Sequence, residues 1–206
     1  NSARKVGTTP MTVLEILEKR GAILHGHFLL ASGKHSDIYV QCQRAFVQPE
    51  DTAFIARKLI EKVEAKLDIK NLTGVVSPAL GAVVIGYEVA RQLNKPFLFA
   101  EREDGNLTFR RGFEIQQNAH YLTVEDVFTT GGSTLELVNL VKNFGGIVDF
   151  ALAVVQRQKE ITLPVPYDSL LFLDLPIYDP GNCPLCKAGL PLVKPGTKQR
   201  QQNSTS

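Results

Sequence analysis

One segment, residues 121–133, constrains the fold of this chain more than any other. It reads Tyr-Leu-Thr-Val-Glu-Asp-Val-Phe-Thr-Thr-Gly-Gly-Ser, an apolar run that ends in two carboxylates and continues into small hydroxyl and glycine residues. The residues after it carry apolar side chains at helical spacing until Gly145. The pattern therefore predicts a strand, a short glycine-containing loop and an amphipathic helix in direct succession.

The predicted loop is suited to bind an anion, because the first backbone N–H groups of a helix have no partner within the helix. Its glycines allow close approach and its hydroxyls add donors; it consists of Thr129, Thr130, Gly131, Gly132 and Ser133. Glu125 and Asp126 would repel phosphate, but they suit sugar hydroxyls or a hydrated cation. A phosphorylated sugar is the ligand this combination predicts.

Two other interpretations of this segment are weaker. A Walker-type nucleotide loop would carry a Lys after its glycines, and here an acidic pair precedes them instead. The segment could also be an ordinary strand, turn and helix with an acidic edge that binds no ligand.

The rest of the chain alternates strands and helices. Apolar runs near residues 73–77, 96–100, 121–124 and 147–155 alternate with helical patterns near 51–67, 81–94 and 133–144. This order predicts an α/β fold, with a twisted, mainly parallel sheet and helices on both faces. Ligands of such sheets gather beyond the carboxyl ends of the strands, where we place three loops: Ser77–Gly81, Glu101–Arg111 and Glu125–Ser133.

Three segments are expected along the 206 residues. Residues 1–50 would form an N-terminal helix, which opens with a capping-box pattern at Thr12 and Glu15, and a small hood of short strands. Residues 51–176 would form the core, and 177–206 an irregular segment and tail. We expect residues 1–8 and the tail from Thr197 to be loose.

Composition excludes several function classes. A net charge of +2 gives no broad basic field, so nucleic acid is not an expected partner. The most apolar stretch, near 74–90, is interrupted by glycine, proline and glutamate, so we expect a soluble chain without a membrane partner. No leader pattern opens the sequence, and cytoplasm is the expected compartment.

The cysteines and histidines carry little signal on their own. Cys183 and Cys186 have a spacing that zinc can use, but no second close pair or nearby His completes four ligands, and we expect incidental reduced thiols. His27 and His35 are interpreted as isolated, structural side chains in a polar turn.

Residues 121–133 resemble the phosphoribosyl pyrophosphate signature of type I phosphoribosyltransferases, in which the acidic pair holds ribose hydroxyls and the loop holds the 5-phosphate. Segments on both sides resemble orotate phosphoribosyltransferases in particular and occur in the same order: Gly26–Ser36, Ser77–Gly81, Phe99–Arg102, Arg110–Phe113 and Val155–Arg157. The type I phosphoribosyltransferase fold is the one this resemblance implies.

The resemblance also implies site residues and partners. The donor would bind Glu125, Asp126, Val127, Phe128, Thr129, Thr130, Gly131, Gly132 and Ser133. Orotate would bind Thr129, Arg157 and Tyr39, and Arg102 and Asp126 would be catalytic. Magnesium (Mg2+) would arrive on the donor without protein ligands, and the chain would form a homodimer.

The sequence departs from the family pattern in its supply of cations. The segment Glu101–Arg111, expected to be a mobile flap around Asp104-Gly105-Asn106, lacks the Lys and His that many relatives carry. Ala31 and Leu80 stand where many relatives have basic residues. Four other cations could compensate at the pyrophosphate: Arg102, Lys34, Arg110 and Arg111.

Three hypotheses therefore remain. The first is an orotate enzyme of de novo pyrimidine synthesis. The second is a purine or other salvage transferase with the same phosphate loop. The third is a catalytically weak, donor-sensing regulator on the same fold, motivated by the missing flap cations.

Overall fold

The computed structural model describes residues 11–30 and 32–195. The expectations for residues 1–8, Ala31 and the tail from Thr197 lie outside this part of the chain. The described chain forms two compact units, one with residues up to 22 and 42–174, the other with 23–41 and those from 175 onward. Within the described ranges, no helix combines the length and apolar character needed to cross a membrane.

The larger unit is built on a six-stranded sheet in the order β5-β4-β3-β6-β7-β8. Five strands are parallel to their neighbours, and β5 pairs antiparallel to β4 at one edge. The strands span Gly74–Pro78 (β3), Phe97–Glu103 (β4), Asn106–Phe109 (β5), His120–Phe128 (β6), Ile147–Gln156 (β7) and Tyr167–Phe172 (β8). The predicted α/β class with a mainly parallel sheet is confirmed.

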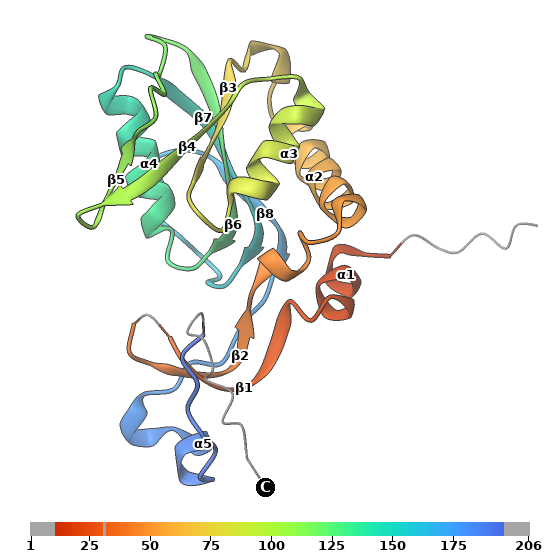
Figure 1. Ribbon diagram of the computed structural model, residues 1–206, viewed down its shortest axis with the longest axis vertical. Helices are drawn as coiled ribbons and strands as arrows, with labels where there is room; N and C mark the ends of the chain where they lie inside the picture. Colours follow the sequence, from red (N-terminus) through yellow and green to blue (C-terminus); the bar gives the residue numbers. More distant parts are fainter. Residues whose placement is uncertain (1–10, 31, 196–206) are drawn as a thin grey trace, which may run out of the picture. The chain divides into compact units, whose positions relative to one another are not determined.

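Helices cover both faces of this sheet. Helices α2 (Pro49–Glu64) and α3 (Val83–Leu93) pack together on one face, and α4 (Gly132–Asn143) lies on the other (Figure 1). The predicted stripe of Ile55, Leu59 and Val63 is fully buried, which is why α2 holds its place against the strands. Two short 3₁₀ turns, Cys42–Arg44 (η1) and Ile69–Asn71 (η2), complete this unit.

The first helix, α1 (Val13–Lys19), forms where the capping pattern predicts it. The Thr12 hydroxyl accepts a hydrogen bond from the Glu15 backbone N–H, and the Glu15 carboxylate accepts one from the Thr12 N–H. Gly21 follows the helix with φ of +64°, a conformation that glycine adopts without strain. This helix belongs to the larger unit.

Two strands of the sheet lie outside the runs that predict strands. Strand β5 turns the expected flap into a β4–β5 hairpin, with its bend at Asp104 and Gly105 as the turn residues indicate. Strand β8 has only half-buried and exposed side chains apart from Ser169, so its apolar pattern is weak. It forms because it pairs in parallel with β7 at the sheet edge.

The smaller unit combines distant parts of the sequence. Strands β1 (Ile23–Leu29) and β2 (His35–Val40) form an antiparallel hairpin. The segment from 175 onward pairs with it through single bridges, Phe28 with Val193 and His35 with Tyr178. This segment contains the 3₁₀ turn η3 (Pro180–Asn182) and the short helix α5 (Pro184–Lys187).

Candidate active site

The candidate site lies where the strand order of the larger unit reverses. After β3 the chain moves to β4 on one side of it, and β6 then pairs on the other side. Loops from the carboxyl ends of β3 and β6 therefore start on either side of this reversal, which is the usual ligand position in such sheets. These loops are residues 79–82 and 129–131.

The loop after β6 is anchored at both ends. Phe128 is fully buried and its ring contacts Tyr167 edge-on, with centroids 6.0 Å apart. Gly131 caps α4 with φ of 84°, a left-handed conformation that its lack of a side chain permits. Between these anchors Thr129 and Thr130 are exposed. The predicted placement of hydroxyls and glycines at a helix N-terminus is confirmed.

Gln43, on η1, connects the loop after β3 to Asp126 near the end of β6. Its side-chain amide donates hydrogen bonds to the Asp126 carboxylate and to the Gly81 carbonyl, the latter over 3.2 Å. A Cβ on Gly81 would lie 2.6 Å from the Gln43 amide nitrogen and 2.8 Å from an Asp126 oxygen. Gly81 is therefore required for this close approach. Sequence reasoning missed Gln43, because it lies in an irregular stretch without a motif.

The strands beneath the site are also held together by a side chain. The Ser77 hydroxyl donates a 2.6 Å hydrogen bond to the Val124 carbonyl, joining β3 to β6. Gly86 of α3 packs directly over Ser77, where a Cβ would lie 2.1 Å from that hydroxyl oxygen. The two strands under these loops are thereby fixed just before the acidic pair.

The two carboxyl groups differ in their environment. Burial raises the pKa of Glu125 to about 8, and the negative charge of Asp126 adds to the shift. Burial also raises the pKa of Asp126, although the Gln43 hydrogen bond acts in the opposite direction. At neutral pH Glu125 is mostly protonated, so the predicted pair of acids carries less than two negative charges.

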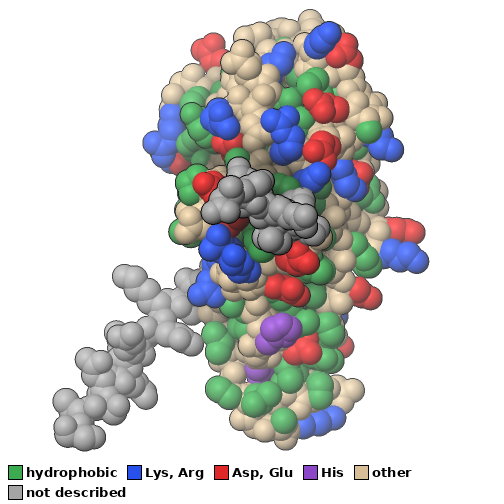
Figure 2. Space-filling view, turned by 90° about the vertical axis from the view of Figure 1, so that its right-hand side faces the viewer, with side chains coloured by type: hydrophobic (Ala, Val, Ile, Leu, Met, Phe, Trp, Pro, Cys, Tyr) green, Lys and Arg blue, Asp and Glu red, His purple; other side chains and the backbone are tan. Residues whose placement is uncertain are grey.

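The cations expected near the leaving group are paired with carboxylates. Arg102 on β4 binds both oxygens of Glu136 on α4, over 2.9 and 3.3 Å, and donates to the Gly105 carbonyl. Arg111 binds both oxygens of Glu101, and Arg110 lies 3.7 Å from Glu103. In the smaller unit Lys34 lies 3.4 Å from Asp179. On the face drawn in Figure 2, basic and acidic side chains are interleaved.

The residues predicted for orotate fall in different parts of the structure. The Arg157 backbone N–H donates a 2.9 Å hydrogen bond to the Phe128 carbonyl, so Arg157 follows β7 directly beside the start of the loop after β6. Tyr39 belongs to the smaller unit, where its ring lies 5.8 Å from that of Phe28. Leu80, in the loop after β3, is 84% exposed.

The fold matches solved phosphoribosyltransferases. A crystal structure of orotate phosphoribosyltransferase from Aeropyrum pernix gives a TM-score of 0.68 at 24% identity, over 79% of this chain and 94% of that one. An adenine phosphoribosyltransferase from Thermoanaerobacter pseudethanolicus gives 0.56 at 14% identity, over 66% and 88%. The structure therefore has the type I phosphoribosyltransferase fold.

Sequence relatives specify the family. Orotate phosphoribosyltransferases from Caldanaerobacter subterraneus subsp. tengcongensis and Thermotoga petrophila are each 46% identical, over 189 and 187 residues. The matches cover 91% and 90% of this chain, and 97% and 98% of those proteins. No family model matches the sequence. The chain belongs to the orotate phosphoribosyltransferase family.

Proposed function

We propose that this chain transfers the 5-phosphoribosyl group from phosphoribosyl pyrophosphate to a ring nitrogen of orotate, giving orotidine monophosphate and pyrophosphate. The observation that carries the proposal is the acidic pair followed by a glycine-capped helix at the strand-order reversal, in a chain 46% identical to enzymes named for this substrate. The fold alone would equally suit an adenine enzyme. The 46% sequence identity to the orotate enzymes, which extends over nine tenths of the chain, favours orotate over adenine as the substrate.

The phosphate end of the donor would bind at the N-terminus of α4. Backbone N–H groups there attract an anion, and the helix dipole adds to the attraction. Thr129, Thr130 and Ser133 are exposed and can donate from their hydroxyls. Val127 and Phe128 would contact the donor through their backbone atoms, since the Phe128 side chain is buried.

The ribose would bind to the acidic pair. Asp126 can accept hydrogen bonds from ribose hydroxyls, and its carboxylate is oriented by the Gln43 amide. Glu125, when protonated, can itself donate a hydrogen bond and adds no repulsion toward the phosphate. Holding the ribose between these groups and the phosphate loop orients C1 for attack.

The leaving pyrophosphate gathers negative charge as the C1–O bond breaks, while the ribose ring gathers positive charge. We assign Arg102 to the pyrophosphate, which requires that its guanidinium exchange Glu136 for the phosphate oxygens. Magnesium would be held by the diphosphate, where it neutralises charge as a Lewis acid. The carboxylate oxygens of Asp126 could accept hydrogen bonds from the water molecules of a hydrated magnesium ion. We assign no protein side chain as a direct ligand of the ion.

Orotate would bind where β7 ends. The planar guanidinium of Arg157 can pair with a carboxylate or with a carbonyl edge, and the resemblance also assigns the exposed Thr129 to orotate. Stacking of Tyr39 on the orotate ring remains a proposal from the resemblance.

The homodimer, the cytoplasmic location and the division into segments 1–50, 51–176 and 177–206 are proposed on the sequence alone.

A pyrophosphate-release assay tests the reaction. Release should require the donor, magnesium and orotate together, and adenine or hypoxanthine should not replace orotate. Asp126→Asn should weaken donor binding about 10- to 100-fold, the loss expected for a charge-assisted hydrogen bond. Asp174→Asn, the same substitution at an exposed position, should leave donor binding unchanged. Turnover of the donor with a purine but not with orotate would indicate a salvage enzyme. Binding of the donor without turnover with any base would indicate a sensor.

A further inference from the structure

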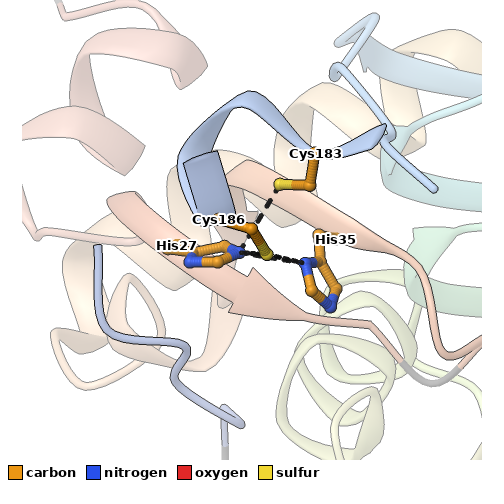
Figure 3. A group of neighbouring side chains, drawn as sticks. All are labelled: His27, His35, Cys183 and Cys186. Atoms are coloured by element: carbon orange, nitrogen blue, oxygen red, sulfur yellow. Dashed lines mark hydrogen bonds between the residues drawn. The ribbon is translucent and has the colours of Figure 1, made fainter. Parts of the chain in front are cut away.

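The smaller unit contains a cluster of potential metal ligands that lies outside the proposed active site. Four side chains from β1, β2 and the segment around α5 point toward one another (Figure 3). They are His27, His35, Cys183 and Cys186, and their ligand atoms all lie within 4.8 Å of one another. The expectation that no His lies near the cysteines, and that both histidines are isolated in a polar turn, is wrong, because both histidines are buried on paired strands beside the cysteines.

The geometry fits one tetrahedral ion. Zinc bound at about 2.0 Å to nitrogen and about 2.3 Å to sulfur separates two nitrogens by about 3.4 Å, and a nitrogen and a sulfur by about 3.6 Å. His27 Nε2 lies 3.0 Å from His35 Nδ1 and 3.6 Å from each cysteine sulfur. Cys186 Sγ lies 3.3 Å from His35 Nδ1. These four separations are within a few tenths of an ångström of the tetrahedral values, and the other two pairs of ligand atoms lie within 4.8 Å.

Hydrogen bonding alone does not account for this convergence. His27 Nδ1 lies 2.8 Å from the Leu190 carbonyl and can approach it only as a donor, which leaves Nε2 unprotonated in the neutral ring. That nitrogen has a single lone pair, yet His35 Nδ1 and both sulfurs lie around it. A cation at the centre would satisfy all four atoms together, and the Leu190 contact is the outer hydrogen bond typical of a metal-bound histidine.

The surrounding backbone also suits a metal site. Cys183 precedes α5 and Cys186 lies within it, so the C-x₂-C spacing places both sulfurs at one turn. His35 exchanges two backbone hydrogen bonds with Tyr178, and Val193 donates one to the His27 carbonyl. Both histidines therefore lie on backbone that is paired with the cysteine-bearing segment.

We propose that His27, His35, Cys183 and Cys186 bind a structural zinc ion that fastens the C-terminal segment to the β1–β2 hairpin. Binding releases the two thiol protons, and two thiolates neutralise the charge of the ion, which suits a site where three of the four ligands are buried. With four protein ligands there is no open position for chemistry. This site is independent of the proposed transfer reaction.

Metal content tests the proposal. The full chain is produced in zinc-supplemented medium, purified without metal-affinity resin, dialysed against a weak chelator and analysed by plasma mass spectrometry. Wild type should retain one zinc per chain. Cys186→Ser, at the exposed ligand, should lose it, while Cys42→Ala and His25→Gln, outside the cluster, should keep it. Wild type without zinc, or Cys186→Ser with full zinc, would overturn the proposal.

Cobalt spectroscopy keeps the test independent of variant folding. Cobalt added to metal-depleted wild type should give the intense visible bands of a tetrahedral site together with thiolate charge transfer. Weak bands typical of six-coordinate cobalt, or no charge transfer, would contradict the ligand set. A strong chelator should lower the Tm of wild type but not of Cys186→Ser, and an unchanged wild-type Tm would refute the fastening role.

Discussion

Replacing Glu125 by glutamine should remove a pH dependence of folding stability that comes from burial of this carboxyl group. Its pKa is raised from 4.5 to about 8, so the folded state keeps a proton that the unfolded chain releases. The stabilising effect is fully present below pH 4.5 and is lost as pH rises through 8. A shift of that size corresponds to at most about 5 kcal/mol of unfolding free energy. The amide side chain of the variant would stay neutral throughout.

Urea unfolding of both proteins between pH 5 and about 9 measures the effect. The unfolding free energy of wild type should fall across this interval relative to that of Glu125→Gln. Glu18→Gln, at an exposed position on α1, is the matched control and should follow wild type. Parallel curves for wild type and Glu125→Gln would show that burial does not hold a proton on Glu125.

Three further predictions concern residues of the site. Gly81→Ala should weaken donor binding and cost about 1–3 kcal/mol in urea unfolding, because the added Cβ would separate Gln43 from Asp126; unchanged donor titration and stability would refute the close approach. Arg102→Ala should lower kcat about 100-fold if the guanidinium stabilises the departing pyrophosphate. Glu136→Gln, which removes its competing partner, should tighten donor binding by up to about 5-fold, and looser binding would contradict the exchange.

The parts of the fold that could be predicted are those specified by short-range patterns. The acidic pair, the hydroxyl loop and the glycine before α4 are contiguous, so their chemistry and their place at a helix N-terminus follow from one segment. The α1 capping box is likewise contained in four residues. Strand β8 could not be predicted in this way, because its stability comes from pairing with β7 and little from its own apolar pattern.

The metal cluster shows why long-range arrangements escape such patterns. The cysteine pair lacks further ligands nearby in the sequence, and the histidines lie about 150 residues away on a hairpin. Each histidine alone is uninformative. The pairing of β2 with Tyr178 and of β1 with Val193 brings the four together, and neither bridge has a local sequence signal.

The pairing of the flap cations has a consequence for donor binding. Arg102, Arg110 and Arg111 each lie beside a carboxylate, so the hairpin offers little net positive charge to a pyrophosphate. In the proposed function, the attraction would come largely from the α4 N-terminus and from the metal that the donor carries. Since Glu125 is mostly neutral at pH 7, the ribose end adds less repulsion than two carboxylates would. We therefore expect this site to select the magnesium complex of the donor strongly over the free anion.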